Sequence, residues 1–431
     1  MRLFSGARCP RRSDARALSS APRSGSVSRV KDRFTPLVLL LTMTLGYVVY
    51  AADRTVLSSM LAPMKVSLAL TNGEVGLLGS AQYMGVLCVV FAAGHLSDRY
   101  GRRRILVLGL AVFTAFTWLI GLSSSFAEAF VFRLVSGLGE GVFWPVAMAS
   151  VADYFKGRKG LALGIFYVGF DVGSVAGLSI GGVAYYLTGD WRPAFFVAPS
   201  LGLIAIAGVA ALRRSFSQSG PDASVSMRLG RDLAPLIRRR NVALLMVFAL
   251  AATWASVWQV VFLPYYFYTV MNFSVLSSAL LSSIVSAAGG FGKVLLGGAS
   301  DAWPRNRMLV SISFAVLLSY GVFFASSSFA VDLLSAIALG FFSSSVFPIM
   351  QALMTDSCDG RSGTALGLTT TTQSVATVLA PIITASFFTF GVGRAVAFSA
   401  MVPAALTILL ALLLTEPRRG SKPSTRSDFQ T

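Results

Sequence analysis

Two related stretches of sequence decide the fold of this chain. The first reads Gly94-His-Leu-Ser-Asp98-Arg99-Tyr-Gly101-Arg102-Arg-Arg104, and the second, 203 residues later (94 to 297), reads Gly297-Gly-Ala-Ser-Asp301-Ala-Trp-Pro-Arg305-Asn-Arg307. The same offset aligns Pro145 with Pro348, Asp153 with Asp356, and the segment 158–164 with 361–367. Because several matches share one offset, we infer that the chain is a tandem duplication of one structural unit.

Each half of the duplication is made of long apolar segments. Of the 431 residues, 55% are hydrophobic and 13% are charged, whereas a soluble protein carries about 25% charged residues. The apolar segments are about 18–25 residues long, which is enough to cross a hydrocarbon core of ~30 Å as helices that satisfy their own backbone hydrogen bonds. We therefore predict an all-α membrane protein in which twelve transmembrane helices form two pseudo-symmetric six-helix bundles. The predicted spans are 36–60, 74–97, 105–122, 127–152, 160–187, 193–212, 241–268, 275–299, 308–326, 329–355, 362–389 and 394–414.

Lysine and arginine lie mainly on one side of the predicted membrane. With the N-terminus in the cytoplasm, 30 of the 36 fall in cytoplasmic segments and three, Lys65, Arg192 and Arg394, fall on the other side. This is the positive-inside bias of membrane proteins. It accounts for the net charge of +18 without a nucleic-acid partner, which we do not expect. We expect a multi-pass protein of the bacterial inner or plasma membrane with both termini cytoplasmic, and an organelle membrane is the alternative.

Composition also divides the chain into five segments. We predict a basic cytoplasmic tail at 1–33, an N-terminal bundle at 34–212, a cytoplasmic linker at 213–240, a C-terminal bundle at 241–414 and a cytoplasmic tail at 415–431. Residues 1–33 are rich in Arg and Ser, a composition that fits either a targeting peptide or a cytoplasmic tail. We favour the tail.

A few ionisable residues lie well inside the predicted spans. Each costs about 2.5–3.5 kcal/mol at mid-span on insertion scales, so these groups should face a cavity or one another. They are Asp53, Arg54, Arg133, Glu140, Asp171 and Lys293. At the 203-residue offset, the uncharged residues Ala336, Ser343 and Ser374 replace Arg133, Glu140 and Asp171. Because the second half has the same predicted helices without these charges, we infer that the charges serve function rather than helix packing.

Arg54 is the first candidate for holding a substrate. Its planar guanidinium group can bind a carboxylate through two charge-assisted hydrogen bonds, and the alternative is a permanent salt bridge to an acid such as Glu140. Asp53 is not expected to pair with Arg54, because adjacent helical positions diverge by about 100°. Arg133 and Glu140 are about 10.5 Å apart along one helix face. They can therefore line one pathway across the membrane at different depths.

Further polar and aromatic residues, among them Gln82, are expected to complete a cavity between the bundles. The substrate-binding candidates besides Arg54 are Tyr50, Tyr83, Trp258, Gln259 and Gln373. Asp171 is a candidate for a second proton site, for a contact to substrate hydroxyl groups or for pairing with Lys293, whereas Lys293 also has the simpler interpretation of a snorkelling side chain.

The stripe Gly169, Gly173, Gly177 and Gly181 predicts close helix contact, and we expect it to be a sliding surface between the bundles.

The first repeat stretch has a mechanical interpretation as a gating loop. Gly94 permits close approach of a neighbouring helix, Asp98 can cap or pair at the membrane edge, and Gly101 permits a tight turn. The basic residues Arg99 and Arg102, with the two arginines that follow, are expected to anchor the loop at the anionic inner leaflet.

The stretch 94–104 is similar to the cytoplasmic-loop signature of the major facilitator superfamily. Three further motifs resemble the anion:cation symporter family within it: Tyr50-Ala-Ala-Asp53-Arg54, Arg133-Leu-Val-Ser-Gly137-Leu-Gly-Glu140-Gly141 with Trp144-Pro145, and Asp190-Trp191-Arg192-Pro-Ala-Phe195. This resemblance implies the major facilitator fold and transport of organic anions such as sugar acids, often with protons. It also implies that Arg54 binds substrate and that its neighbour Asp53 is a proton-site acid. Glu140 is then the main proton carrier, and Arg133 modulates it. Asp171 departs from the family pattern.

We therefore expect a secondary active transporter, a proton-coupled symporter of a small organic anion (a sugar acid, dicarboxylate or aromatic acid) that works by alternating access. The alternatives are a proton-coupled exporter of an amphipathic compound and a non-transporting membrane sensor. No enzyme activity, metal or cofactor is expected, since the three cysteines and the single histidine form no cluster. The expected partners are the anion, protons and the lipid bilayer, and we expect a monomer.

Overall fold

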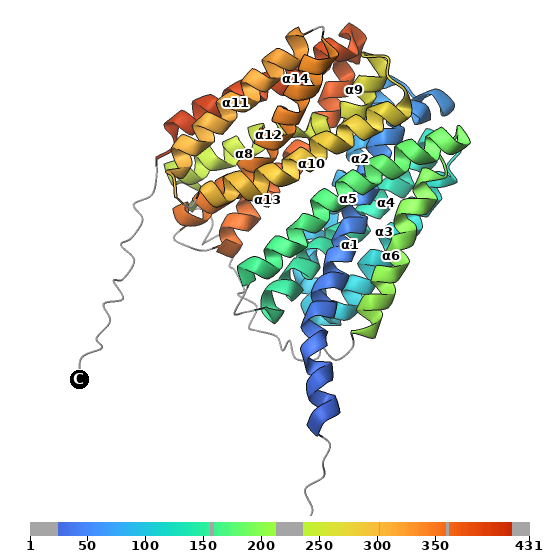
Figure 1. Ribbon diagram of the computed structural model, residues 1–431, viewed down its shortest axis with the longest axis vertical. Coiled ribbons are helices and arrows are strands. Elements are labelled where there is room, and N and C mark those ends of the chain that lie inside the picture. Colours follow the sequence, from blue (N-terminus) through green and yellow to red (C-terminus); the bar gives the residue numbers. More distant parts are fainter. Residues whose placement is uncertain are drawn as a thin grey trace, which may run out of the picture.

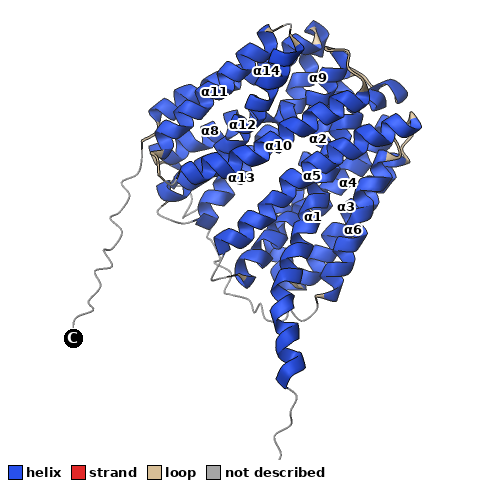
Figure 2. Cartoon of the chain, in the orientation of Figure 1, coloured by secondary structure: helices blue, strands red, loops and turns tan. Residues whose placement is uncertain are grey.

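The computed structural model describes residues 25–155, 159–212, 236–300, 302–326, 328–358 and 362–415. These residues form helices joined by short connections and contain no β-strand (Figures 1 and 2). Twelve candidate spans within them are long and apolar enough to cross a membrane, as the sequence predicts. The elements are α1 (Gly25–Ser67), α2 (Asn72–Tyr100), α3 (Arg102–Gly121), α4 (Phe126–Tyr154), α5 (Lys159–Thr188), α6 (Ala194–Ala211), α8 (Arg240–Val261), α9 (Leu263–Thr269), α10 (Val275–Ala299), α11 (Arg305–Ala325), α12 (Phe329–Ser357), α13 (Ser362–Ser386), the 3₁₀ helix η2 (Phe387–Phe390) and α14 (Val392–Leu413).

The helices form two bundles. In the first bundle α1 packs on α5 and α6, α2 packs on α4, and α3 packs on α4 and α6. The second bundle repeats these pairs: α8 packs on α13 and α14, α10 packs on α12, and α11 packs on α12 and α14. Figure 1 shows the two groups side by side, with α5 and α10 facing each other between them. The duplication seen in the sequence is therefore a duplication of helix packing.

Corresponding backbones come equally close in the two bundles. A Cβ atom added at Gly137 of α4 would lie 2.1 Å from the backbone oxygen of Gln82 on α2. At the 203-residue offset, a Cβ atom added at Gly340 of α12 would lie 2.3 Å from the backbone oxygen of Val285 on α10. Only glycine permits either approach, so the same helix pairs use the same close contact in both halves.

The seventh predicted span, 241–268, is two helices rather than one. α8 ends at Val261 and α9 begins at Leu263, with Pro264 in its first turn. Proline has no backbone N–H to donate to the preceding turn, and its ring crowds that turn, so the helix is interrupted here. The eleventh span likewise ends as the separate 3₁₀ turn η2, and α1 extends beyond the predicted span 36–60 at both ends.

The glycine stripe of α5 lies against α1, within the first bundle. Cβ atoms added at Gly173 and Gly177 would lie 2.2 Å and 2.3 Å from the backbone oxygens of Val48 and Ala52. The prediction of a sliding surface between bundles is therefore wrong. The spacing of four correctly indicates close helix packing, but a sequence pattern does not name the partner helix.

The two bundles meet through α5 with α10 and through α2 with α13. We call the end of the bundles where α1 begins and α14 ends the terminal side, and the opposite end the distal side. A Cβ atom added at Gly76 would lie 2.6 Å from Cβ of Ala385, and one added at Gly182 would lie 2.6 Å from Cβ of Ala279. All four residues belong to the distal halves of their helices, so the bundles are in close contact on the distal side.

Candidate functional site

Arg54 lies on α1, in the middle of the first bundle, and is paired with an acid. Its Nε donates to Oε2 of Glu140 on α4 at 2.9 Å. The guanidinium group lies over two aromatic rings, 4.3 Å from the centre of the Tyr50 ring and 4.9 Å from that of Tyr83. These cation–π contacts hold the group in one orientation. Of the two interpretations of Arg54, the described state contains the salt bridge to Glu140.

Asp53, the neighbour of Arg54, pairs with a different arginine. Nη1 of Arg133 on α4 donates to Oδ1 of Asp53 at 3.2 Å. The hydroxyl groups of Thr117 on α3 and Ser136 on α4 also donate to this carboxylate, at 2.6 Å and 3.2 Å. As expected from the divergence of adjacent helical positions, Asp53 and Arg54 face different partners.

Gln82 on α2 joins the two ion pairs. Its Nε2 donates to Oδ2 of Asp53 and to Oε1 of Glu140, each at 2.6 Å. Asp53, Gln82, Arg133 and Glu140 are all buried, and Arg54 is 13% exposed. The result is one network of two cations and two anions, which we call the charge network, and its net charge is zero when both acids are ionised.

The sequence does not reveal every member of this network. Thr117 and Ser136 were not among the predicted site residues, whereas Gln82 was expected only as one of several polar residues that could complete the cavity. The sequence spacing could have identified Ser136 as a site residue. It follows Arg133 by three residues and precedes Glu140 by four, so all three lie on the same helix face. No sequence feature identifies Thr117 as a site residue, because hydroxyl residues are common in membrane helices and usually bond their own backbone.

The charge network belongs to the first bundle alone. At the 203-residue offset, Gln82, Arg133 and Glu140 correspond to Val285, Ala336 and Ser343. The second bundle nevertheless keeps the close approach of α10 and α12 described above. The fold therefore forms without these charges, which supports a functional role for them.

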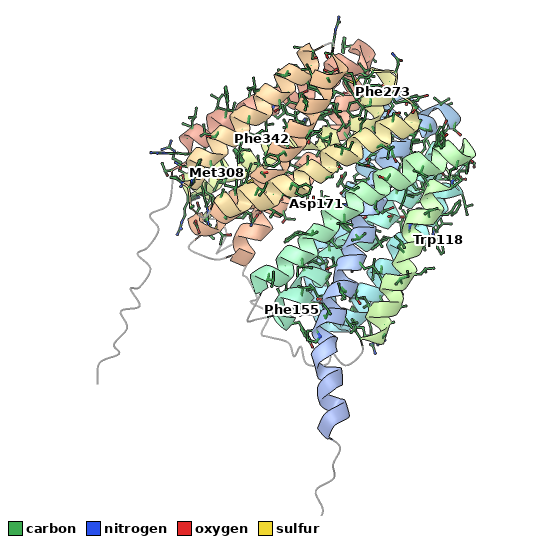
Figure 3. All side chains as sticks on the ribbon, in the orientation of Figure 1. Trp118, Phe155, Asp171, Phe273, Met308 and Phe342 are labelled. Atoms are coloured by element: carbon green, nitrogen blue, oxygen red, sulfur yellow. The ribbon has the colours of Figure 1, made fainter. Side chains whose placement is uncertain are left out.

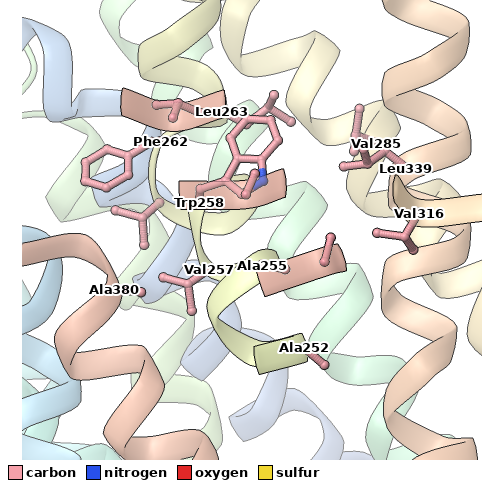
Figure 4. Packing of buried hydrophobic residues seen from close by; sticks show 14 of the residues in the cluster. Ala252, Ala255, Val257, Trp258, Phe262, Leu263, Val285, Val316, Leu339 and Ala380 are labelled. Atoms are coloured by element: carbon pink, nitrogen blue, oxygen red, sulfur yellow. The ribbon is translucent and has the colours of Figure 1, made fainter. Parts of the chain in front are cut away.

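Two of the three substrate-binding candidates in the second bundle, Trp258 and Gln259, are held by Tyr320 on α11. Trp258 Nε1 donates to the Tyr320 hydroxyl at 2.9 Å and Gln259 Nε2 donates to it at 3.3 Å. Figure 4 shows Trp258 packed among apolar side chains of neighbouring helices, and its side chain is only 2% exposed. Gln259 lines the cavity described next, whereas Gln373 on α13 is not part of this hydrogen-bonded group.

A cavity of about 70 Å³ lies between the bundles and is lined by residues of both. Asp171 of α5 and Lys293 of α10 are in its wall, and Lys293 Nζ donates to Oδ1 of Asp171 at 2.6 Å. Figure 3 shows Asp171 on α5 beside α10. The structure thus joins these residues as a pair, one of the interpretations that the sequence left open. Thr55, the residue after Arg54, also lines the cavity.

The gating loop forms an ion pair that recurs in the second bundle. Nη1 of Arg102 donates to Oδ2 of Asp153 at 2.6 Å, and at the same offset Nη1 of Arg305 pairs with Oδ2 of Asp356. Gly101 has a φ of 90°, which favours glycine. Arg99 lies over the ring of the adjacent Tyr100. The predicted roles of Gly94 and Asp98 concern positions that lie outside the residues whose side chains are described.

Comparison with known proteins identifies the family. A sequence profile described as Major Facilitator Superfamily matches residues 43–381 and 312–430. The probable 4-methylmuconolactone transporter of Cupriavidus pinatubonensis is 31% identical over 209 residues, which are 46% of this chain and 48% of that protein. The protein spinster of Drosophila melanogaster is 26% identical over 226 residues, which are 52% of this chain and 36% of that protein. These matches thus span about half or less of the relatives' length.

Solved structures share the fold. A D-xylose–proton symporter superposes with a TM-score of 0.72 at 16% identity, covering 89% of this chain and 98% of that one. The arrangement of two related bundles is therefore that of known carriers. Because the family profile covers most of the sequence, the chain belongs to the Major Facilitator Superfamily.

Proposed function

We propose that the protein is a proton-coupled symporter of a small organic anion that works by alternating access. The observation that carries this proposal is the neutral charge network, in which Arg54 is held by Glu140, a carboxylate. A substrate carboxylate has the same chemistry as the Glu140 side chain and can take its place on the guanidinium group. Arg54 is then the substrate anchor, and Glu140 is the group that it releases.

Charge balance explains why a proton accompanies the anion. Bringing one anion into the network, with Asp53 and Glu140 both ionised, would leave an uncompensated negative charge in a site removed from water. Such a charge is costly, and breaking a buried pair costs about 3–5 kcal/mol. A proton on Glu140 restores neutrality, since it frees Arg54 for the substrate. In the empty carrier, Glu140 loses the proton and returns to Arg54.

Access from one side at a time follows from the contacts between the bundles. Ser80 Oγ donates to the backbone oxygen of Val378 at 2.8 Å, and Lys65 Nζ donates to the Tyr265 hydroxyl at 3.1 Å. These contacts join the bundles in their distal halves. The positive-inside bias assigns the termini to the cytoplasm, so we propose that the described state is closed on the outer side and that rocking of the bundles opens it.

Uptake by proteoliposomes tests this proposal. Purified protein is reconstituted, and uptake of radiolabelled gluconate, succinate and benzoate is measured with and without an imposed pH gradient, acidic outside. We expect at least one acid to accumulate several-fold above its equilibrium level only with the gradient, and a protonophore to abolish the accumulation. Protein-free liposomes are the control. Uptake that is the same with and without the gradient would contradict symport.

A further inference from the structure

The Asp171–Lys293 pair joins the two bundles. It connects α5 of the first bundle to α10 of the second, with 2.6 Å between Oδ1 and Nζ. The other described ion pairs each lie within one bundle, as the Arg54–Glu140 and Arg102–Asp153 pairs do. Among the residues that the structure describes, this is therefore the ion pair that links the two moving parts.

The backbone opposite Asp171 is shaped to receive it. Gly290 on α10 faces Asp171, and a Cβ atom added there would lie 3.1 Å from Cβ of Asp171. Lys293 follows three residues later on the same helix, on the same face. The Lys293 ammonium also lies 5.3 Å from the centre of the Phe170 ring. Two groups on α10, a glycine and a lysine, thus fit one carboxylate on α5.

The pair borders the cavity between the bundles, and both of its side chains are partly exposed. The side chain of Lys293 is 30% exposed and that of Asp171 is 19% exposed. The cavity has room for several water molecules, and polar residues of both bundles line it, including Ser174, Gln259 and Ser344. An ion pair in contact with water contributes little net stability, so another carboxylate can replace Asp171 beside Lys293 at small cost.

We propose that Lys293 receives the carboxylate of the transported anion on the second bundle and that Asp171 is the group which the anion displaces. This inference rests on the proposed transport of an organic anion and adds the contact that the charge network, confined to the first bundle, does not supply. In the empty carrier, Asp171 keeps Lys293 paired, because an unpaired ammonium group between closing bundles is costly. Substrate and Asp171 compete for one cation.

We call the displacement of Asp171 from Lys293 by the anion the exchange. Measuring how variants bind acids and the corresponding amides tests it. Isothermal titration of purified protein compares gluconate, succinate and benzoate with gluconamide, succinamide and benzamide, which have similar shapes and no charge. We expect Lys293→Met to weaken binding of the best acid by about tenfold, a change of about 1.4 kcal/mol, without changing the binding of its amide. We expect Asp171→Asn to strengthen acid binding, since the competing carboxylate is gone.

Three further variants separate the effect of the charge at position 293 from that of positive charge elsewhere and from that of an unpaired charge. Lys293→Arg keeps a cation and should keep the preference for acid over amide. Arg394→Met removes a positive charge from an exposed position of the same bundle and should leave acid and amide binding unchanged. The neutral double variant Asp171→Asn/Lys293→Met, checked by size exclusion for correct folding, should lose the preference without leaving an unpaired charge.

The outcomes distinguish the exchange from symport itself. An acid preference that survives Lys293→Met unchanged would overturn the exchange, even when wild-type uptake follows the pH gradient. Conversely, a Lys293-dependent preference in a protein whose uptake ignores the gradient would support the exchange while contradicting symport. Failure of both wild type and Asp171→Asn to bind any of the acids would also overturn the exchange.

Discussion

At the scale of single residues, the side-chain amide of Gln82 links the two acids of the charge network. The Gln82 nitrogen shares its two hydrogens between Asp53 and Glu140, at 2.6 Å from each. Both carboxylates are buried, where an acceptor without a donor pays its full desolvation cost. Gln82 therefore fixes the positions of the two acids relative to each other, and a change of charge on one acid acts on the other through their common donor.

Replacing Gln82 by leucine, which has a similar size, removes this donor. We expect Gln82→Leu to lower the initial rate of gradient-driven uptake about tenfold or more, since each hydrogen bond to a charged group is worth about 1.5–3 kcal/mol. Gln351→Leu is the matched control, because Gln351 is bonded to Thr369 in the second bundle. A Gln82→Leu rate no lower than that of the control would show that the shared donor is dispensable.

The charged members of the network are predictable from sequence, and the Arg54–Glu140 pair was one of two interpretations of Arg54, but the Arg133–Asp53 pair was not predicted. Asp53, Arg54, Arg133 and Glu140 stand out because charge in an apolar span is costly. Which arginine meets which acid depends on the rotation of α1 and α4 and on the path of α2 between them. The hydroxyl donors Thr117 and Ser136 cost little in lipid, so composition does not single them out.

At the scale of helices, the contact of α1 with α5 sets the position of Arg54. The stripe Gly169, Gly173, Gly177 and Gly181 brings the two backbones together along their length. α5 also carries Asp171, and α1 carries Arg54 and Thr55, so this contact places the charge network beside the cavity between the bundles. The stripe therefore stabilises the first bundle as one rigid unit.

A side chain within the stripe should separate α1 from α5. We expect Gly173→Val to lower the thermal unfolding midpoint, because its Cβ would meet the backbone oxygen of Val48 and overpacking costs about 1–3 kcal/mol. Gly164→Ala on the same helix is the control, since no described atom outside its own stretch of helix lies within 4 Å of the added Cβ. Equal melting of the two variants, measured by intrinsic fluorescence in detergent, would refute the role of the stripe.

Helix number follows from the sequence, while helix ends and partners require the structure. Apolar length alone predicts twelve spans, because a fixed membrane thickness imposes it. The break between α8 and α9 was missed although Pro264 marks it, since proline is tolerated in membrane helices when neighbours satisfy the freed groups. The partner of the glycine stripe depends on tertiary packing, which periodicity does not encode.

At the scale of the whole molecule, the two bundles share a scaffold but not a charge pattern. The pairs Arg102–Asp153 and Arg305–Asp356 lie at equivalent positions; the sequence repeat aligns their residues but did not predict that they pair. The charge network is not duplicated, so we propose that the first bundle binds the proton and that the second contributes Lys293 and Gln259 to the cavity. We also propose that the segments 34–212 and 241–414 move as units.

The proposed coupling of anion to proton is tested most directly by Glu140→Gln. Glutamine still offers Arg54 an amide oxygen but carries no proton to exchange, so the anion can bind and leave while its movement no longer follows the pH gradient. Accumulation and counterflow exchange of the same acid are measured in proteoliposomes, beside Glu128→Gln at an exposed helix start. We predict that Glu140→Gln loses gradient-driven accumulation about tenfold or more and keeps exchange near the wild-type rate, while Glu128→Gln keeps both. Wild-type accumulation by Glu140→Gln would contradict the account.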